Sequence, residues 1–589
     1  MELVLNNPIV WLLAIALPLV TACAVLVPRC RLLSQKIAPW SALPALLLAL
    51  SPQMTRSVDV PWLLLGSRLG LDEVSRVFLF FSAVLWLTSG LFALGYLGKD
   101  SRRYLFFFFF LTAMSGNFGL ILAQDMALFY VCFALMSFAS YGLVVFSGDA
   151  DARRAGRVYI ALVIVGELLL FSGLVVAASE TGSMRWDGLG DRLLATPDGS
   201  IAMFLLFFGL AVKAGALPLH VWLPLAHPAA PVPASAVLSG AMIKAGLIGW
   251  LRLVPSETST MFLGWSELCL VLGLAAAFYG VAIGLTQNNA KTVLAYSSIS
   301  QMGLMTVGVG LAISGPDSPH AALTATLVYA MHHGFAKGAL FLGVGVASTA
   351  CGTLWRRCLC GLGLLLPALA LAGMPLTSGA LAKAMLKSSA STAPENWLST
   401  LALLLPLAAV GTTLLMARFL WIAWPKRDSR TQAQGLSVWL SWIVLLIAVA
   451  LGVFLWPWGD SVSLGKSLVS PAKMFAAMWP VLAGVAIALI ASAASAAGYR
   501  FPIPVIPAGD ILQVAARCTA LTVRGCKTFA ASPGFLAPGR SVLSGKVAVG
   551  KAFSAKLAED LETGMRRSLF FGVVLLTLGG IILGLLAFS

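Results

Sequence analysis

The stretch AVKAGALPLHVWLPLAHPAAPVPASAVLSGAMIK (211–244) places two lysines, two of the chain's five histidines and five prolines in a mostly apolar segment. Proline removes a backbone donor and clashes with the carbonyl four residues back, so we expect a helix that breaks near 214–218, at Pro218. Open backbone at membrane depth is tolerated only where it is buried in protein or lines a wet cavity. Broken helices of this kind mark ion sites in transporters. The stretch therefore predicts a discontinuous membrane helix with ionisable groups beside its break.

The composition around this stretch is that of an integral membrane protein. Of the 589 residues, 59% are hydrophobic and only 11% are charged, whereas soluble domains carry about 25% charged residues. Apolar runs of bilayer length recur along the whole chain. They predict an all-α polytopic fold of about sixteen transmembrane helices, near 8–27, 37–51, 75–97, 104–122, 125–147, 158–178, 201–218, 233–252, 261–285, 292–313, 320–347, 361–386, 398–424, 436–457, 474–497 and 569–588.

Basic residues predict the orientation of these spans. Lysine and arginine gather in the loops that follow odd-numbered spans, and such loops face the cytoplasm. Both termini then face outward, in a bacterial-type inner membrane. The net charge of +16 follows from these loops, so it does not indicate a nucleic-acid partner. The N-terminus MELVLNNPIVWLLAIALPL has no basic region before its apolar run, which favours a retained span over a signal peptide.

Cofactor motifs are missing from the sequence. The nine cysteines are scattered, without histidine neighbours or a C-x-x-C pair. No haem, dinucleotide or P-loop motif occurs. We expect no metal site, no redox cofactor and no catalytic redox residue in this chain.

The late segment 498–568 differs from the rest. It opens with FPIPVIPAGD and ends in the basic, amphipathic KVAVGKAFSAKLAEDLETGMRR before a last span. It is either a solvated tail or an interfacial helix on anionic lipid, or a lateral helix that contacts the domain or a neighbouring subunit. A terminal span after it fixes both of its ends and favours the lateral helix. The expected organisation is N-terminal spans (1–100), a first half (101–255), a second half (256–425), C-terminal spans (426–497), the lateral segment (498–568) and a terminal helix (569–589).

Four lysines lie well inside apolar runs. Ionisable groups at such depth are costly and mark ion or proton pathways; snorkelling near a helix end accounts only for Lys387 and Arg252. MHHGFAKGALFLG (331–343) adds histidines beside one of these lysines, and AYSSISQMG (295–303) adds hydroxyl groups that hold ordered water. The expected proton relay comprises Lys213, His220, Lys244, His333, Lys337 and Lys383, with secondary positions at His227, His332, Lys291, Tyr296, Ser297 and Ser300.

A second break is expected at Pro375, in LAGMPLTSGALAKAML (371–386). The broken spans at 201–218 and 361–386 cross the membrane in opposite directions by the loop assignment. Opposite crossing is the arrangement that two inverted five-helix repeats require. From the residues alone, the chain is an ion-conducting membrane protein.

The motifs together resemble one family. The opening stretch, TQNNAKTVLAYSSISQMG (286–303), HHGFAKGALFLGVG (332–345) and LAGMPLTSGALAK (371–383) are similar to the antiporter-like subunits of respiratory complex I. The same family includes the membrane subunits of group 4 hydrogenases and formate hydrogenlyase, and the multi-subunit Na⁺/H⁺ antiporters. The likeness covers about 70–425. WLPLAHPAAPVPASAVLSGAMIK is most similar to the hydrogenase-4 branch, and the late segment resembles the lateral helix of the largest complex I antiporter-like subunit.

The resemblance implies roles at matching positions. Lys213 is similar to the lysine of the first broken helix, which exchanges protons under the influence of a carboxylate. Lys244 and His220 match connecting residues of a central hydrophilic axis. His333 and Lys337 match the relay of the second half. Lys383 matches the lysine that passes protons to the outer side.

One position departs from the family pattern. In YVCFALMSFASYGL (130–143), Ala134 stands where relatives carry the glutamate that pairs with the first lysine. Glu167, in ALVIVGELLLFSG (161–173), is the acidic residue deep in that region. We hypothesise that Glu167 takes over this role, since a charged pair at depth costs less than either group alone. The alternatives are that Glu167 faces another subunit or that the first half no longer pumps.

The expected function is that of a proton-translocating membrane subunit of a multi-subunit redox-driven complex, without redox chemistry of its own. Its partners would be other membrane subunits, the lipid bilayer and protons, or Na⁺ or K⁺. One alternative is a subunit of a cation/proton antiporter with no redox partner. A second is a scaffold subunit that has lost conduction, which Ala134 would permit.

Overall fold

In the computed structural model of the chain, the described residues are 8–51, 56–64, 66–98, 100–255, 263–314, 319–348, 354–391, 393–425, 435–452, 471–498 and 506–509. They divide between two compact units. The first unit comprises residues 1–59 and 68–509 and carries the membrane helices. The second comprises 60–67 and 510–589, and nearly all of it lies outside the described residues, as do the expected lateral segment and the terminal helix.

The N-terminal part combines one long helix with short elements. Helix α2 (Pro8–Leu26) is followed by α3 (Arg31–Ile37), η1 (Ala38–Ala42) and α4 (Leu43–Ala49). The expected span at 37–51 is therefore wrong as a single helix, because prolines at 39 and 44 start new short helices there. Strands β1 (Arg56–Val60) and β2 (Ser67–Leu71) form a two-stranded sheet, which the all-α expectation missed.

The next four helices are long, and three of them begin at side-chain caps. They are α5 (Glu73–Tyr96), α6 (Arg103–Leu122), α7 (Met126–Val144) and α8 (Ala150–Thr181). Three of them start after an aspartate whose carboxylate accepts a hydrogen bond from a backbone N–H of the first turn: Asp72, Asp125 and Asp149. An aspartate at this position satisfies a donor that the helix itself leaves open.

The stretch at 211–244 folds into several short helices. Helices α9 (Leu189–Leu194) and α10 (Gly199–Ala214) precede η2 (Leu219–Val221), α11 (Trp222–Ala229), α12 (Val232–Val237), the π-helix η3 (Leu238–Met242) and α13 (Lys244–Arg252). The residues between α10 and η2 are those at which a break was expected.

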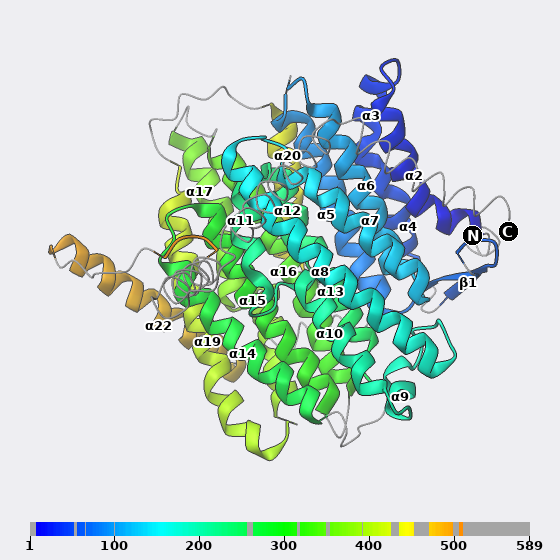
Figure 1. The fold of residues 1–589 in the computed structure, drawn as a ribbon. Helices are drawn as coiled ribbons and strands as arrows, with labels where there is room; N and C mark the ends of the chain where they lie inside the picture. The colour runs from blue at the N-terminus through cyan, green and yellow to red at the C-terminus, as the bar shows by residue number, and fades with distance from the viewer. Residues whose placement is uncertain are drawn as a thin grey trace, which may run out of the picture. The chain divides into compact units, whose positions relative to one another are not determined.

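The second part of the bundle has a similar succession. It runs through α14 (Leu263–Leu285), α15 (Ala290–Ser314), α16 (Pro319–Ala347), α17 (Leu354–Ala372), α18 (Ser378–Ala390), α19 (Glu395–Ala423), α20 (Leu436–Leu451) and α22 (Pro471–Ala496). The residues between α17 and α18 include Pro375, so this span is also interrupted. Figure 1 shows most of these helices side by side, with α22 projecting away from the others.

Among the described residues, twelve segments are long and apolar enough to cross a membrane. The window of α15 that qualifies is wholly buried, whereas that of α22 is only 17% buried, so α15 is a core helix and α22 faces the surroundings. The expected polytopic helical fold is confirmed. The count of sixteen spans and the inverted repeats stay predictions.

Candidate functional site

Helix α10 ends one residue after Lys213. Gly215 follows with φ +68°, the left-handed conformation that glycine adopts without strain and that commonly ends helices. The chain turns and restarts at η2 and α11, which brings Trp222 back against α10. There the indole Nε1 donates a hydrogen bond to the Val212 carbonyl at 2.8 Å. The break therefore places Lys213 at the end of α10, with the Trp222 indole packed next to it.

The Lys213 amine is buried beside a tyrosine that the sequence did not single out. Lys213 is 3% exposed, and its Nζ donates to the Tyr159 hydroxyl at 3.1 Å. Tyr159 in turn donates to the Ser137 carbonyl at 2.9 Å. The Tyr159 ring meets Trp222 edge-on, with centroids 5.2 Å apart. The sequence shows only that a tyrosine lies inside a membrane helix. Its contact with Lys213 becomes visible in the structure.

Glu167 lies on the same small cavity as Lys213. The cavity has a volume of about 10 Å³, and Glu167, Ser137, Trp222 and Lys213 are among the residues that line it. Glu167 is 5% exposed, and neither of its carboxylate oxygens has a hydrogen-bond partner among the described residues. A volume of this size holds about one water molecule. The acidic residue is thus placed next to the first lysine.

Glycines on both helices allow α8 and α10 to approach closely. A Cβ on Gly209 would lie 2.6 Å from the Leu170 nitrogen, and one on Gly166 would lie 2.9 Å from the Val212 side chain. Small residues at helix contacts let backbones approach in membranes. This contact sets Glu167, the neighbour of Gly166, beside the end of α10.

The π-helix η3 positions Lys244 at the centre of the bundle. A π-turn shifts the register of a helix and is frequent at functional sites. Lys244 is fully buried, and its Nζ donates to the Ser239 carbonyl at 2.7 Å. It also lies 2.7 Å from Nδ1 of His333, on α16. This contact joins two of the expected relay residues directly, although they are 89 residues apart in the sequence.

The remaining lysines bind backbone carbonyls. Lys337 donates to the Leu294 carbonyl at 2.8 Å. Lys383 donates at 2.7 Å to the carbonyl of Ala372, the last residue of α17. That carbonyl has no partner within its own helix, so the break between α17 and α18 provides the acceptor for the lysine.

The histidines have different surroundings. His332 Nδ1 lies 2.9 Å from the Ser378 hydroxyl, and His220 packs edge-on against Tyr279. His227 is fully buried and stacks on Phe341. Neither of its ring nitrogens has a hydrogen-bond partner among the described residues. It lies within electrostatic reach of lysines 244, 291 and 337.

The other secondary positions lie along α15. Lys291 donates to the Ala230 carbonyl at 2.6 Å, and Ser300 donates to the Ala277 carbonyl at 2.8 Å. Tyr296 and Ser297 are fully buried. Of the sequence-derived set, the structure therefore brings Lys244 to His333 and Lys213 to Glu167. Lys337 and His227 lie within electrostatic reach of the Lys244–His333 contact.

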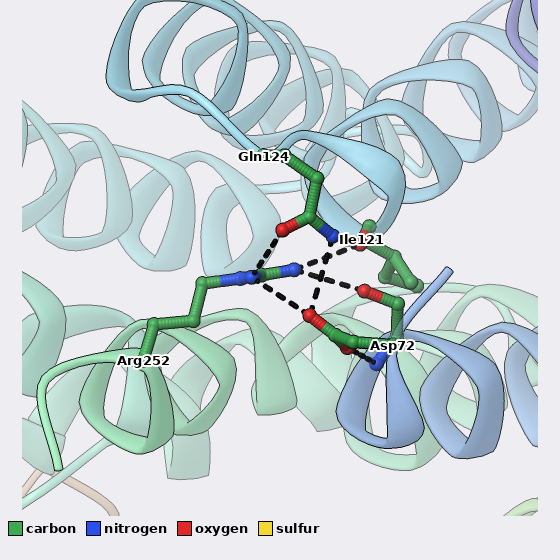
Figure 2. Close-up of polar contacts among 5 residues, drawn as sticks. Asp72, Ile121, Gln124 and Arg252 are labelled. Atoms are coloured by element: carbon green, nitrogen blue, oxygen red, sulfur yellow. Dashed lines mark hydrogen bonds and ion pairs between the residues drawn. The ribbon is translucent and has the colours of Figure 1, made fainter. Parts of the chain in front are cut away.

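A second polar cluster, at the end of α13, was missed (Figure 2). Arg252 is only 5% exposed at its side chain and pairs with Asp72 at 3.2 Å, so the expectation that it snorkels is wrong. Its guanidinium also donates to Gln124 Oε1 at 3.1 Å and to the Ser75 hydroxyl at 2.9 Å. Gln124 donates to Asp72 at 3.2 Å. The cluster ties α13 to the start of α5 and to the turn between α6 and α7.

Charge and hydrogen bonding dominate the chemistry of Asp72, which lies just before α5. Burial acts to raise the pKa of its carboxyl group. The Arg252 charge and the hydrogen bonds from Ser75 and Gln124 outweigh it, so the pKa lies below its ordinary value. The cluster is therefore an ion pair at neutral pH.

Comparisons with known proteins give the family of this architecture. Residues 123–407 match the family described as NADH:quinone oxidoreductase/Mrp antiporter, TM. The chain is 31% identical over 286 residues to hydrogenase-4 component B of Escherichia coli (strain K12), covering 47% of this chain and 43% of that protein. It is 30% identical over 344 residues to Na(+)/H(+) antiporter subunit A1 of Staphylococcus aureus (strain JH9), covering 54% and 43%.

The fold is also similar to a solved structure, that of the Mrp complex from Dietzia sp. DQ12-45-1b. The TM-score is 0.71 at 21% identity, with 94% of this chain and 63% of that chain covered. The chain spans less than half the length of the curated relatives named above. The resemblance inferred from the motifs is confirmed. Residues 123–407, just under half of the chain, therefore match the family described as NADH:quinone oxidoreductase/Mrp antiporter, TM.

Proposed function

We propose that this chain is a proton-translocating, antiporter-like membrane subunit of a multi-subunit redox-driven complex, and that protons pass along its buried lysines and histidines. The observation that carries the proposal is the 2.7 Å contact between Lys244 Nζ and His333 Nδ1. It links α13 to α16 in the buried core, where an amine and an imidazole exchange a proton without rearrangement of either helix. Imidazole is suited to this exchange because it gains and loses a proton near neutral pH.

Electrostatic repulsion within the core couples the protonation of neighbouring groups. Lys244, His333 and Lys337 interact electrostatically with one another. Within the described part of the chain, no carboxylate hydrogen-bonds to any of them. Like charges at short range in a low-dielectric medium repel strongly, so a proton that arrives on one of these groups displaces the proton from the next. Backbone carbonyls of Ser239 and Leu294 hold the lysine that is charged.

The first half would use Glu167 in place of the carboxylate that Ala134 does not supply. Glu167 shares a cavity with Lys213, and a carboxylate there stabilises the protonated amine. Glu167→Gln and Glu167→Ala should both slow proton uptake by inverted membrane vesicles that carry the assembled complex, by roughly tenfold or more for loss of a charged partner. Unchanged coupling in both variants would exclude this role.

Two lysine substitutions test the function as a whole. Lys213→Ala and Lys383→Ala should each abolish most proton uptake, because each removes a proton-carrying group beside a helix break. Lys387→Ala is the matched control, since Lys387 lies on the same helix as Lys383 and is exposed. If both variants assemble and take up protons at the wild-type rate, the chain is a scaffold subunit.

A cation/proton antiporter without a redox partner is the second candidate function. The similarity to a Na(+)/H(+) antiporter subunit favours this second function. The similarity to a hydrogenase component favours the redox-linked function. Purification of the complex and identification of its other membrane subunits separate the two. In either case, a conformational or electrostatic signal from the partners would act by shifting Lys213 between protonation states.

The same proposal includes the membrane arrangement. The basic helix starts at Arg102–Arg103, before and in α6, and at Arg153–Arg154, in the first turns of α8, would face the cytoplasm, with both termini outside, in a bacterial-type inner membrane. The halves 101–255 and 256–425 would be inverted repeats. Their broken helices, α10–α11 and α17–α18, each present a lysine beside the break.

A further inference from the structure

Lys213 contacts two groups of different chemistry on α8. Its amine is hydrogen-bonded to the Tyr159 phenol, and it shares a cavity with the Glu167 carboxylate. We propose that Tyr159 and Glu167 are alternative partners of the Lys213 amine, and that the lysine side chain moves between them as the first half loads and releases its proton. The consequence for transport rests on the proposed function.

Tyr159 is built to accept a hydrogen bond from Lys213. Because its own proton is donated to the Ser137 carbonyl at 2.9 Å, its oxygen presents lone pairs to the Lys213 Nζ. The edge-on contact with Trp222, tilted by 70°, fixes the ring. A hydrogen bond from an ammonium group to such an acceptor is stronger than a neutral one. Tyr159 therefore holds the charged lysine without neutralising it.

The Glu167 carboxylate is not saturated with hydrogen bonds in this conformation. It interacts with the Ser137 hydroxyl on the same cavity and with the Lys213 charge, but neither of its oxygens has a donor in full hydrogen-bonding geometry among the described residues. Leaving buried acceptors unsatisfied is costly, so an incoming amine is favourable. The lysine side chain has a flexible four-carbon stem, and the cavity of about 10 Å³ admits a bridging water.

The two partners lie at different depths of one rigid helix. Tyr159 and Glu167 are eight residues apart on α8, which corresponds to about 12 Å along the helix axis. This is the separation of the two backbone positions, whereas the amine moves only within the reach of one lysine side chain. Tyr159 is nearer the end that carries Arg153 and Arg154. Movement of the amine from the phenol to the carboxylate exchanges a neutral partner for an anionic one. A small change in local field is sufficient to shift populations between two such states.

Tyr159→Phe tests the proposal because it removes only the hydroxyl group. Tyr96→Phe is the matched control: Tyr96 lies at the end of α5 and stacks on Phe92, outside α8 and α10. Proton uptake is measured in vesicles that carry the complex, with assembly checked on native gels. Tyr159→Phe should slow uptake roughly tenfold, because it removes one hydrogen bond to a charged group. Tyr96→Phe should leave uptake unchanged.

Infrared difference spectroscopy of the purified complex separates this role from a structural one. The carboxyl band that disappears in Glu167→Gln belongs to Glu167. It should change frequency in Tyr159→Phe, since the amine then donates to the carboxylate, and should keep its frequency in Tyr96→Phe.

Slower uptake with an unchanged Glu167 band would overturn the two-partner proposal, as would wild-type uptake in Tyr159→Phe. If Lys213→Ala reduces uptake while Tyr159→Phe does not, the proposed function survives and this inference fails; wild-type uptake in Lys213→Ala would overturn both.

Discussion

Arg252 shows how a charged residue at a helix end differs from what its position suggests. Its sequence context, two turns beyond Lys244 at the end of an apolar run, fits snorkelling. In the fold its guanidinium is surrounded by Asp72, Gln124 and Ser75. These partners come from two distant parts of the chain, so no local sequence pattern indicates the cluster. Only the packing of α13 against the start of α5 and the end of α6 creates it.

Arg252→Ala should destabilise the protein by about 2 kcal/mol, because it leaves a charged carboxylate and an amide without their donors. Thermal unfolding in detergent is the measurement. Arg185→Ala is the control: its pair with Asp59 is exposed and longer, at 3.8 Å, and such surface pairs contribute under about 1 kcal/mol. Equal melting temperatures for wild type and Arg252→Ala would contradict the cluster's role.

The lowered pKa of Asp72 gives the same cluster a pH dependence. A carboxyl whose pKa is lower in the folded state than in the unfolded state adds stability at pH values above its ordinary pKa, about 4. That stability is lost as the pH falls through the folded value. The difference in melting temperature between wild type and Asp72→Asn should therefore be largest near neutral pH and shrink below about pH 4. A difference that is constant with pH would show that the charge of Asp72 is not involved.

The residues of the proposed relay and their partners are also of two kinds. Some are recognisable in the sequence, and others only in the structure. Lysines at 213, 244, 337 and 383 are visible because charge inside an apolar run is rare. Tyr159 is not visible, since a tyrosine in a membrane helix is ordinary until its hydroxyl is seen beside the Lys213 amine at 3.1 Å. The acceptors of the other lysines are backbone carbonyls, which carry no sequence signal at all.

At the scale of elements, the break after α10 depends on Gly215. Its φ of +68° disfavours any residue with a Cβ, and a Cβ there would lie 2.2 Å from the Leu223 side chain of α11. Gly182, at the end of α8, has a similar φ of +61° with nothing within 4 Å of a Cβ. Substitution of Gly182 by alanine therefore introduces backbone strain alone, whereas the same substitution at Gly215 adds a steric conflict.

Gly215→Ala should be more destabilising than Gly182→Ala. Both variants cost about 1–2 kcal/mol for the left-handed conformation, and only the first must also displace the buried Leu223 side chain of α11, next to Trp222. Melting temperature and proton uptake are measured on both. Gly215→Ala should lose stability and uptake, and Gly182→Ala should lose a little stability only. Equal effects of the two substitutions would contradict a special role of the α10 break.

Prolines predicted the positions of the breaks better than they predicted the helices around them. Pro218 and Pro375 lie in the gaps between α10 and η2 and between α17 and α18. The π-helix η3 contains no proline, and its sequence, LSGAM, has no distinctive pattern. Its register is set by contacts such as the close approach of Gly240 to Gly334. Tertiary contacts of this kind cannot be predicted from the periodicity of apolar residues in the sequence.

At the scale of the whole molecule, hydropathy was sufficient for the helical membrane fold but not for its details. Apolar runs located most long helices to within a few residues. They failed at 37–51, where two prolines divide the segment, and they gave no sign of the strands β1 and β2. A hairpin this short buries too little apolar surface to produce a clear alternating pattern.

The proposed orientation can be tested with single cysteines on opposite sides of α8. Ser147→Cys lies in the exposed turn before this helix, and Asp187→Cys lies in the exposed region after it. A membrane-impermeant maleimide should label the second variant in intact cells and the first only in inverted vesicles, above the background of the native cysteines. The reverse labelling pattern would show that the basic loops do not face the cytoplasm.

The central claim is that protons cross between the two halves through the contact of Lys244 with His333. Proton uptake by inverted vesicles that carry Lys244→Ala in the assembled complex tests it most directly, with Lys387→Ala as the control. We predict that Lys244→Ala lowers uptake by at least about a hundredfold, the scale of removing a proton-transfer group, and that Lys387→Ala retains the wild-type rate. Wild-type uptake in Lys244→Ala would contradict the claim.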